Sequence, residues 1–138
     1  KALAMRAGEE VWNKGDMAAA DEIYASNYIR HQDTFPEGII RGRDAYKQHI
    51  MGCHTAWPDW HMTLKDMWVK GDKVVDWWVI SGTFTGKVEG FPPPTGKETA
   101  FEVVCIHRIA GGKIVEDWIY LQDLVLMSQM GMKLVPAQ

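Results

Sequence analysis

Two residues near the C-terminus could move protons together. His107 and Asp117 lie on successive stretches in which apolar residues alternate with other types. A histidine beside a carboxylate inside an apolar pocket is a suitable general acid or base, because burial and the partner's charge tune the pKa of each group. The same two residues are also typical of a core histidine with a satisfied ring, with Asp117 at a solvent-filled rim. The sequence leaves both interpretations open.

Other potentially reactive residues form weaker patterns. His31 and Asp33 form a His-x-Asp pair, but this spacing is common by chance, so we expect no metal there and interpret His31 as a pocket-lining or surface histidine. Cys105 could act as a nucleophile beside His107, although the stronger expectation is a buried, inert thiol. The sequence has no phosphate-binding Gly-rich loop, Gly-x-Ser-x-Gly elbow or zinc signature, which disfavours nucleotide binding, serine catalysis and zinc chemistry.

The elements that must position these residues begin with helices. Apolar residues at helical spacing predict a helix over residues 2–13, and Asp16 can cap a second one. Residues 28–31 form a short extended piece, and the Pro and Gly of residues 33–38 indicate a loop. A third helix is predicted from residue 42 to residue 57, just before a proline.

Beyond this point the apolar period changes from that of a helix to that of a strand. We expect a last short helix from Asp123 to Gly131, preceded by strands at Trp60–Lys70, Lys73–Thr85, Lys97–Ile109 and Lys113–Gln122. Helices followed by a run of strands indicate an α+β fold with a curved, mainly antiparallel sheet. The 138 residues suit a single domain. A bent sheet with helices packed against it leaves a cone-shaped pocket for a ligand.

The last hairpin fixes which residues share a face. A three-residue turn at residues 110–112 would pair Ile109 with Lys113 and set His107 diagonal to Asp117. The inner face would then carry Phe101, Val103, Cys105, His107, Val115, Asp117, Ile119 and Leu121. We expect Val103, Cys105 and Ile119 to contact the ligand, and Trp57, Trp78 and Phe91 to shape the pocket.

Composition excludes several classes of function. The net charge is −3 without a basic run, so nucleic acid is an unexpected partner. No apolar stretch approaches the ~18 residues that cross a membrane, and no signal-peptide pattern is present. The 2 cysteines form no disulfide framework, which predicts a reducing, cytoplasmic location. The 7 Trp and 8 Met could fill a core or line a cavity for a flat apolar ligand.

Several segments match motifs of a known family: Gly82–Gly86, Gly90–Lys97, Arg108–Trp118 and Asp123–Gly131. Together they resemble the SnoaL-like polyketide cyclases, from about residue 5 to residue 131. The resemblance implies the cone fold of nuclear transport factor 2-like proteins, and dimers or larger oligomers formed through the sheet. The best-known activity of this family is a cofactor-free aldol ring closure on a polyketide ester.

The resemblance also points to particular positions. The family's carboxylate acid/base lies on the last strand, and alignment on Gly112-Lys113-Ile114 puts it at Ile119, with the partner histidine at Cys105. Ile119 cannot transfer a proton. His107 and Asp117 lie two residues along each strand on the same face, so a shifted pair could perform related chemistry on another ligand.

The leading hypothesis is therefore a cofactor-independent enzyme acting on a small hydrophobic carbonyl compound, as a cyclase, isomerase or related lyase. His107 would be the base, Asp117 its orienting group or the acid, and His31 a hydrogen-bond donor to the substrate oxygen. The alternative is a non-catalytic protein that binds a small hydrophobic ligand, and a third hypothesis is a structural or interaction domain. A homodimer through the sheet face that carries Trp118 and Tyr120 is expected.

Overall fold

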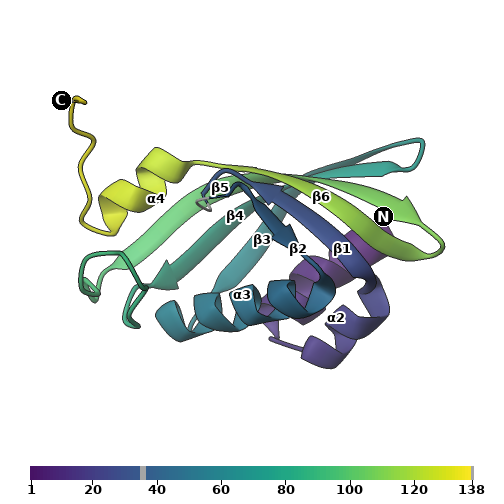
Figure 1. Ribbon diagram of the computed structural model, residues 1–138, viewed down its shortest axis with the longest axis horizontal. Coiled ribbons are helices and arrows are strands. Elements are labelled where there is room, and N and C mark those ends of the chain that lie inside the picture. Colours follow the sequence, from purple (N-terminus) through teal and green to yellow (C-terminus); the bar gives the residue numbers. More distant parts are fainter. Residues whose placement is uncertain (35–36, 138) are drawn as a thin grey trace.

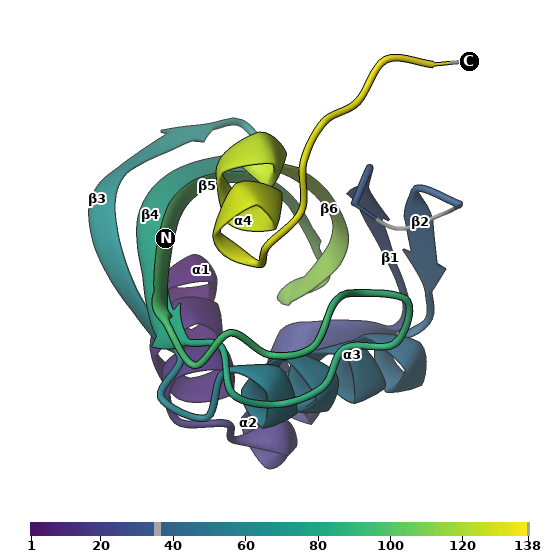
Figure 2. The ribbon, with the colours of Figure 1, turned by 90° about the vertical axis from the view of Figure 1, so that its left-hand side faces the viewer.

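The computed structural model describes residues 1–34 and 37–137 and is built on a mixed, six-stranded sheet in the order β2-β1-β6-β5-β4-β3. All neighbouring strands are antiparallel except β1 and β6, which are parallel. The sheet bends along its strands and across them, so that one face is concave (Figures 1 and 2). The strands are β1 (Tyr24–Gln32), β2 (Ile39–Arg41), β3 (His61–Lys70), β4 (Lys73–Thr83), β5 (Glu98–Ala110) and β6 (Lys113–Leu121).

The helices close the concave side of the sheet. Figure 2 shows α1, α2 and α3 lying across the open side of the arch, while α4 stands at one end. Their bounds are α1 (Ala2–Arg6), the π-helix η1 (Ala7–Asn13), α2 (Met17–Ile23), α3 (Arg43–Ala56) and α4 (Asp123–Gln129). The predicted α+β class with a curved, mainly antiparallel sheet is confirmed. None of the helices within the described residues is long and apolar enough to cross a membrane.

Local sequence signals account for the ends of the helices. The Asp16 carboxylate accepts a hydrogen bond from the Ala19 N–H at 3.0 Å and caps α2, as predicted. Gly42 precedes α3 with φ of 91°, a conformation that favours glycine. The Trp57 N–H closes the last turn of α3 on the Cys53 carbonyl at 2.8 Å, directly before Pro58, which cannot continue a helix.

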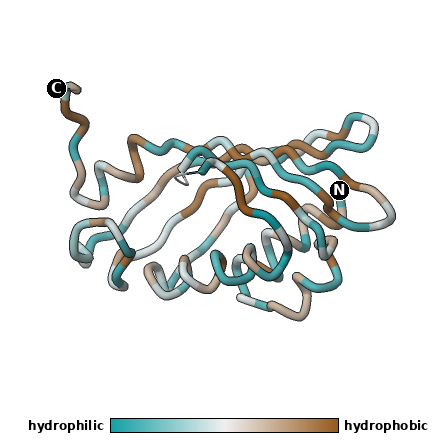
Figure 3. Tube along the Cα trace, in the orientation of Figure 1, coloured by the Kyte–Doolittle hydropathy of each residue, from teal (hydrophilic) through white to brown (hydrophobic). Residues whose placement is uncertain are grey.

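Alternation along the strands separates the two faces of the sheet, and Figure 3 shows hydrophobic and hydrophilic residues alternating along the chain. On β4 the buried face carries Val74, Asp76, Trp78 and Ile80. On β5 it carries Phe101, Val103, Cys105 and His107. Apolar side chains from this face and from the helices form one hydrophobic core, and His107 and Asp76 are charged exceptions within it.

The predicted register of the last hairpin is wrong by one residue at the turn and by two residues beyond it. The turn has two residues, Gly111 and Gly112, both with positive φ, so Ala110 pairs with Lys113. A bulge at Val115 then restores the alternation, because Ile109 pairs with Ile114 but Arg108 pairs with Glu116. His107 therefore lies directly opposite Asp117 rather than diagonal to it, and Ile114 takes the buried place expected of Val115.

Other differences are smaller. The predicted helix over residues 2–13 is present, but its second half has the wider π-helical turn. The extended piece expected at residues 28–31 is the middle of the longer strand β1, and β2 was not predicted. The loop expected at residues 33–38 lies partly outside the described residues.

Two helical glycines differ in the space available for a larger side chain, so their replacement by alanine should have opposite effects on stability. A Cβ on Gly8 would overlap the ring of Trp78, whereas a Cβ on Gly52 would meet no atom within 4 Å. We expect Gly8→Ala to lower the free energy of unfolding by about 1–3 kcal/mol through overpacking. The control Gly52→Ala should leave it unchanged or raise it by about 0.5–1 kcal/mol. Urea unfolding of both variants measures this, and equal stabilities would contradict the close approach of η1 to β4.

Candidate active site

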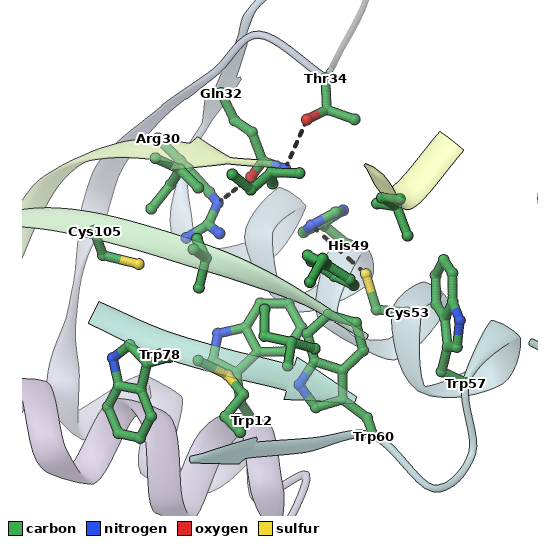
Figure 4. A pocket seen from close by; sticks show the side chains of 18 of the residues that line it. Trp12, Arg30, Gln32, Thr34, His49, Cys53, Trp57, Trp60, Trp78 and Cys105 are labelled. Atoms are coloured by element: carbon green, nitrogen blue, oxygen red, sulfur yellow. Dashed lines mark hydrogen bonds between the residues drawn. The ribbon is translucent and has the colours of Figure 1, made fainter. Parts of the chain in front are cut away.

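A cavity of about 870 Å³ lies between the helices and the concave face of the sheet. Its walls come from the helices η1, α3 and α4, from the strands β1, β4, β5 and β6, and from the residues around Phe91. Figure 4 shows Trp12, Trp57, Trp60 and Trp78 arranged around it. Most of the lining is therefore aromatic or aliphatic, and its polar groups gather in a few places.

The most strongly charged of these places is a buried row of three side chains. His107 Nδ1 lies 2.5 Å from Asp117 Oδ1, and His107 Nε2 lies 2.9 Å from Asp76 Oδ2. Asp117 and Asp76 are 0% and 1% exposed, so both carboxylates are screened from bulk water. The three residues come from neighbouring strands: His107 is paired with Asp117 across β5 and β6, while Asp76 is on β4.

Two further residues hold the Asp117 end of the row. The Tyr28 hydroxyl donates to Asp117 Oδ2 at 2.5 Å, and the Arg30 guanidinium lies 3.8 Å from the same oxygen. Arg30 also donates to Gln32 at 2.9 Å and to the Tyr46 hydroxyl at 3.1 Å. Both carboxylate oxygens of Asp117 thus have partners. Asp117 lies behind His107, whereas the side chains of His107, Asp76 and Arg30 line the cavity.

The charge state of His107 follows from these contacts. Burial alone would lower the pKa of His107, but the charges and hydrogen bonds of Asp117 and Asp76 outweigh it and raise the pKa to about 10. At neutral pH the ring is an imidazolium that donates from both nitrogens. It has no lone pair with which to accept a substrate proton.

Asp76 is the functional candidate that sequence reasoning missed. Its Oδ1 is buried, and no nitrogen or oxygen donor within the described residues reaches it, although the carboxylate lies beside the Cys105 thiol. Asp76 lies two residues before Trp78, so the strand period that placed Trp78 on the inner face also placed Asp76 there. That period was the signal that could have identified it.

The predicted pocket residues largely come together. Those that line the cavity are Trp57, Trp78, Phe91, Val103, Cys105, His107 and Ile119. His31 does not join them. It points to the other face of the sheet, stacks on Trp118 and lies 2.7 Å from Glu116. Neighbouring residues of a strand face opposite sides, so Arg30 takes the inward place on β1.

The thiols and the remaining pocket histidine are held in neutral forms. Burial raises the pKa of Cys53 to about 12 and lowers the pKa of His49, 3.7 Å away, to about 3. Burial, and then the charge of Asp76, raise the pKa of Cys105 well above its ordinary value. Neither thiol is prepared to act as a nucleophile at neutral pH. Asp76, Cys105 and His107 do form a group with the ligand atoms that a metal ion requires.

The comparisons with known proteins agree with this architecture. The family model of the SnoaL-like polyketide cyclases matches residues 2–130. The chain belongs to this family. The comparison with curated proteins found no match.

Solved structures of similar proteins cover nearly the whole chain. IdmH from Streptomyces antibioticus, a candidate polyketide cyclase, is 26% identical with a TM-score of 0.81, over 95% of this chain and 97% of IdmH. TsrD from Streptomyces laurentii is 25% identical with a TM-score of 0.81, over 95% and 96% of the two chains. A SnoaL-like candidate polyketide cyclase from Jannaschia sp. CCS1 has a TM-score of 0.85 at 18% identity, over 96% and 91%, and shows the shared fold alone. Family and neighbours support a cyclase- or isomerase-type role in general.

The charge on His107 makes stability depend on pH in a predictable direction. A pKa raised from 6.5 to about 10 stabilises the folded state fully below pH 6.5 and progressively less as the pH rises toward 10. The free energy of unfolding of the native chain, relative to His107→Gln, should fall by up to about 1.4 kcal/mol per pH unit in this window. Denaturant unfolding across the window measures it, with His61→Gln as an exposed control. Parallel curves for the native chain and His107→Gln would contradict the charged row.

Proposed function

We propose that this protein is a cofactor-independent acid/base enzyme that acts on a small hydrophobic carbonyl compound. The observation that carries the proposal is the Asp76 carboxylate, which faces an apolar cavity with one unpartnered oxygen and has a charged histidine behind it. A general base must present a free lone pair to the substrate, and Asp76 Oδ1 has one.

The size and lining of the cavity support the class of ligand. A volume of about 870 Å³ lies within the range of roughly 300–1,000 Å³ that is usual for small-molecule sites. Trp12, Trp57, Trp60 and Trp78 offer flat apolar surfaces, and the polar groups are few and localised. This combination favours a mostly hydrophobic molecule that carries a small number of oxygen atoms.

The geometry suggests a division of labour that differs from the one expected from sequence. Asp76 would take a proton from the carbon beside the carbonyl, and the electron pair of that C–H bond would move onto the carbonyl oxygen. Arg30, a buried cation of the same cavity, would stabilise the negative charge on that oxygen in place of His31. The enolate would then accept a proton at another atom, or attack a second carbonyl carbon and close a ring.

His107 and Asp117 would support this base rather than act as it. The imidazolium of His107 holds Asp76 in position through the 2.9 Å hydrogen bond, and Asp117 fixes the orientation of the ring. Buried charges cost several kcal/mol unless they are well paired, and such costs are concentrated at functional sites. A purely structural core could fill the same space with apolar side chains.

A second candidate function is the binding of a hydrophobic ligand without catalysis. The observation that favours it is the cross-strand pair of Cys105 and Ile119. The family resemblance puts the acid/base histidine and carboxylate at these two positions, and neither residue can replace them here. Under this alternative Asp76 and Arg30 would only hydrogen-bond to the polar end of the ligand.

The test begins with a thermal-shift screen of hydrophobic ketones, lactones, epoxides and polycyclic esters. A ligand at ~100 times its dissociation constant adds about 2.7 kcal/mol to stability. Compounds that bind are then assayed for turnover. Asp76→Asn should reduce kcat by about a hundredfold to ten-thousandfold and keep the thermal shift, because the amide cannot take up the proton.

Asp72→Asn, an exposed change in the β3–β4 turn, is the matched control and should retain full activity. Unchanged kcat in Asp76→Asn would remove Asp76 as the base. Ligands that bind the native chain but are never converted would favour the binding protein.

We also propose a homodimer formed through the outer face of the sheet. Apolar side chains lie in cross-strand rows on this face, with Trp118, Ile106, Val75 and Trp68 in one of them. Trp68 and Tyr120 are at least half exposed in the single chain, and such a patch is typical of an interface. The expected cytoplasmic location stays a prediction, supported only by the two free cysteines.

Light scattering after gel filtration tests the dimer. The native chain should elute at twice the mass of one chain, and Ile106→Glu, at the centre of the row, should elute as a monomer because it buries a charge in the interface. Leu134→Glu changes an exposed apolar residue outside the sheet and should remain a dimer. A monomeric native chain would refute the interface.

A further inference from the structure

Three side chains of the cavity wall bring oxygen, sulfur and nitrogen ligand atoms together. One such atom from each of Asp76, Cys105 and His107 lies within 4.8 Å of the other two, and all three residues are buried. The sheet fixes this arrangement, because Asp76 and Cys105 are cross-strand partners and His107 is two residues along β5 on the same face. Figure 4 shows the sulfur of Cys105 directed toward the cavity.

A second observation, the buried Asp76 carboxylate, points to a cation as the ligand of this group. Asp76 is 1% exposed, and no nitrogen or oxygen donor among the described residues reaches its Oδ1, although the carboxylate lies beside the Cys105 thiol. A buried carboxylate oxygen without a partner costs free energy, and a cation satisfies it better than a neutral donor. The oxygen belongs to the same cavity wall as the Cys105 thiol.

The surroundings of His107 match the support that metal-binding histidines usually have. Its Nδ1 lies 2.5 Å from Asp117, and Tyr28 and Arg30 hold that carboxylate in place from the far side. A histidine that donates one ring N–H to a carboxylate presents its other nitrogen to a metal in a fixed orientation. Here the other nitrogen is Nε2, which carries a proton and faces Asp76 when no metal is bound, so metal binding would release this proton to solvent.

We propose that Asp76, Cys105 and His107 bind a thiophilic divalent cation of the Zn²⁺ class. The Cys105 thiol would release its proton on binding the ion, so that one carboxylate and one thiolate balance the double charge, and a sulfur, nitrogen and oxygen set suits tetrahedral Zn²⁺. The fourth position would face the cavity, as it does in catalytic rather than structural zinc sites. The sequence spacing gave no sign of this site, since its ligands come from two strands.

This inference goes beyond the acid/base proposal and uses some of the same atoms. A bound ion would occupy the lone pairs of Asp76 that proton abstraction requires. It would also replace the hydrogen bond between Asp76 and His107. Metal binding and cofactor-free proton transfer are therefore alternative states of one site, and Zn²⁺ would inhibit the proposed reaction.

The test uses Co²⁺ as a spectroscopic substitute for Zn²⁺, with chelator-treated full-length chain and no substrate. We expect one Co²⁺ per chain by equilibrium dialysis, an intense thiolate-to-cobalt absorption band, and displacement by Zn²⁺. Cys105→Ser should abolish the band, and Asp76→Asn should weaken binding at least tenfold. Asp117→Asn, which removes only the support of His107, should weaken it by about 10–100-fold. Circular dichroism confirms that each variant folds.

Cys53→Ser is the matched control, because Cys53 is the other cysteine of the cavity and lies near His49. It should keep both the band and the affinity. Loss of the band in Cys53→Ser but not in Cys105→Ser would overturn the proposal, as would the absence of the band in the native chain. Because no substrate is present, a failure here leaves the kinetic test of Asp76 intact, and the reverse also holds.

Discussion

The hydrogen-bonded contact of His107 with two buried carboxylates is the constraint on which the rest of this structure depends. Each of the three groups would be very costly alone in an apolar interior, and removal of His107 would take the shared partner from both carboxylates. The contact requires β4, β5 and β6 to keep their register, since one step of slippage would turn the three side chains outward. It also requires Tyr28 and Arg30, which neutralise the far side of Asp117.

The cavity lies beside a core in which the helices pack on the sheet, and the size of the side chains sets how closely they approach. Gly8 lets η1 approach the ring of Trp78 closely, while large aromatic side chains such as Trp12 and Trp60 hold the elements apart elsewhere. Trp12 and Trp60 stack with their ring centroids 5.0 Å apart, which stiffens this wall. Rigid apolar walls exclude water from Asp76, and electrostatic interactions at that carboxylate are correspondingly strong.

Strand period and helix caps were sufficient to predict the α+β class, the long strands and several residues of the cavity lining, among them Trp78, Val103 and Ile119. They failed where pairing depends on tertiary geometry. The Val115 bulge leaves no signal in the sequence, although it decides that His107 faces Asp117 directly. His31 was misplaced because its neighbour Arg30, a charged residue, occupies the inward position. Asp76 was overlooked for a similar reason, because a lone aspartate in an apolar strand is ordinarily expected on the solvent-facing side.

The position of the charges also bears on what the family relationship can say about the reaction. The pair at Cys105 and Ile119 is apolar, and the charged pair lies two residues nearer the β5–β6 turn. Asp76 itself is the cross-strand partner of Cys105, so it lies in the row of Cys105 and Ile119 but on β4, on the other side of β5 from Ile119. A substrate carbon that reacts at Asp76 must therefore be displaced sideways, across the sheet, from one that reacts beside Ile119. In a cavity with fixed aromatic walls, that displacement changes which carbon atom of a flat molecule meets the base. Membership of the family thus constrains the shape of the ligand more tightly than it constrains which bond the reaction forms or breaks.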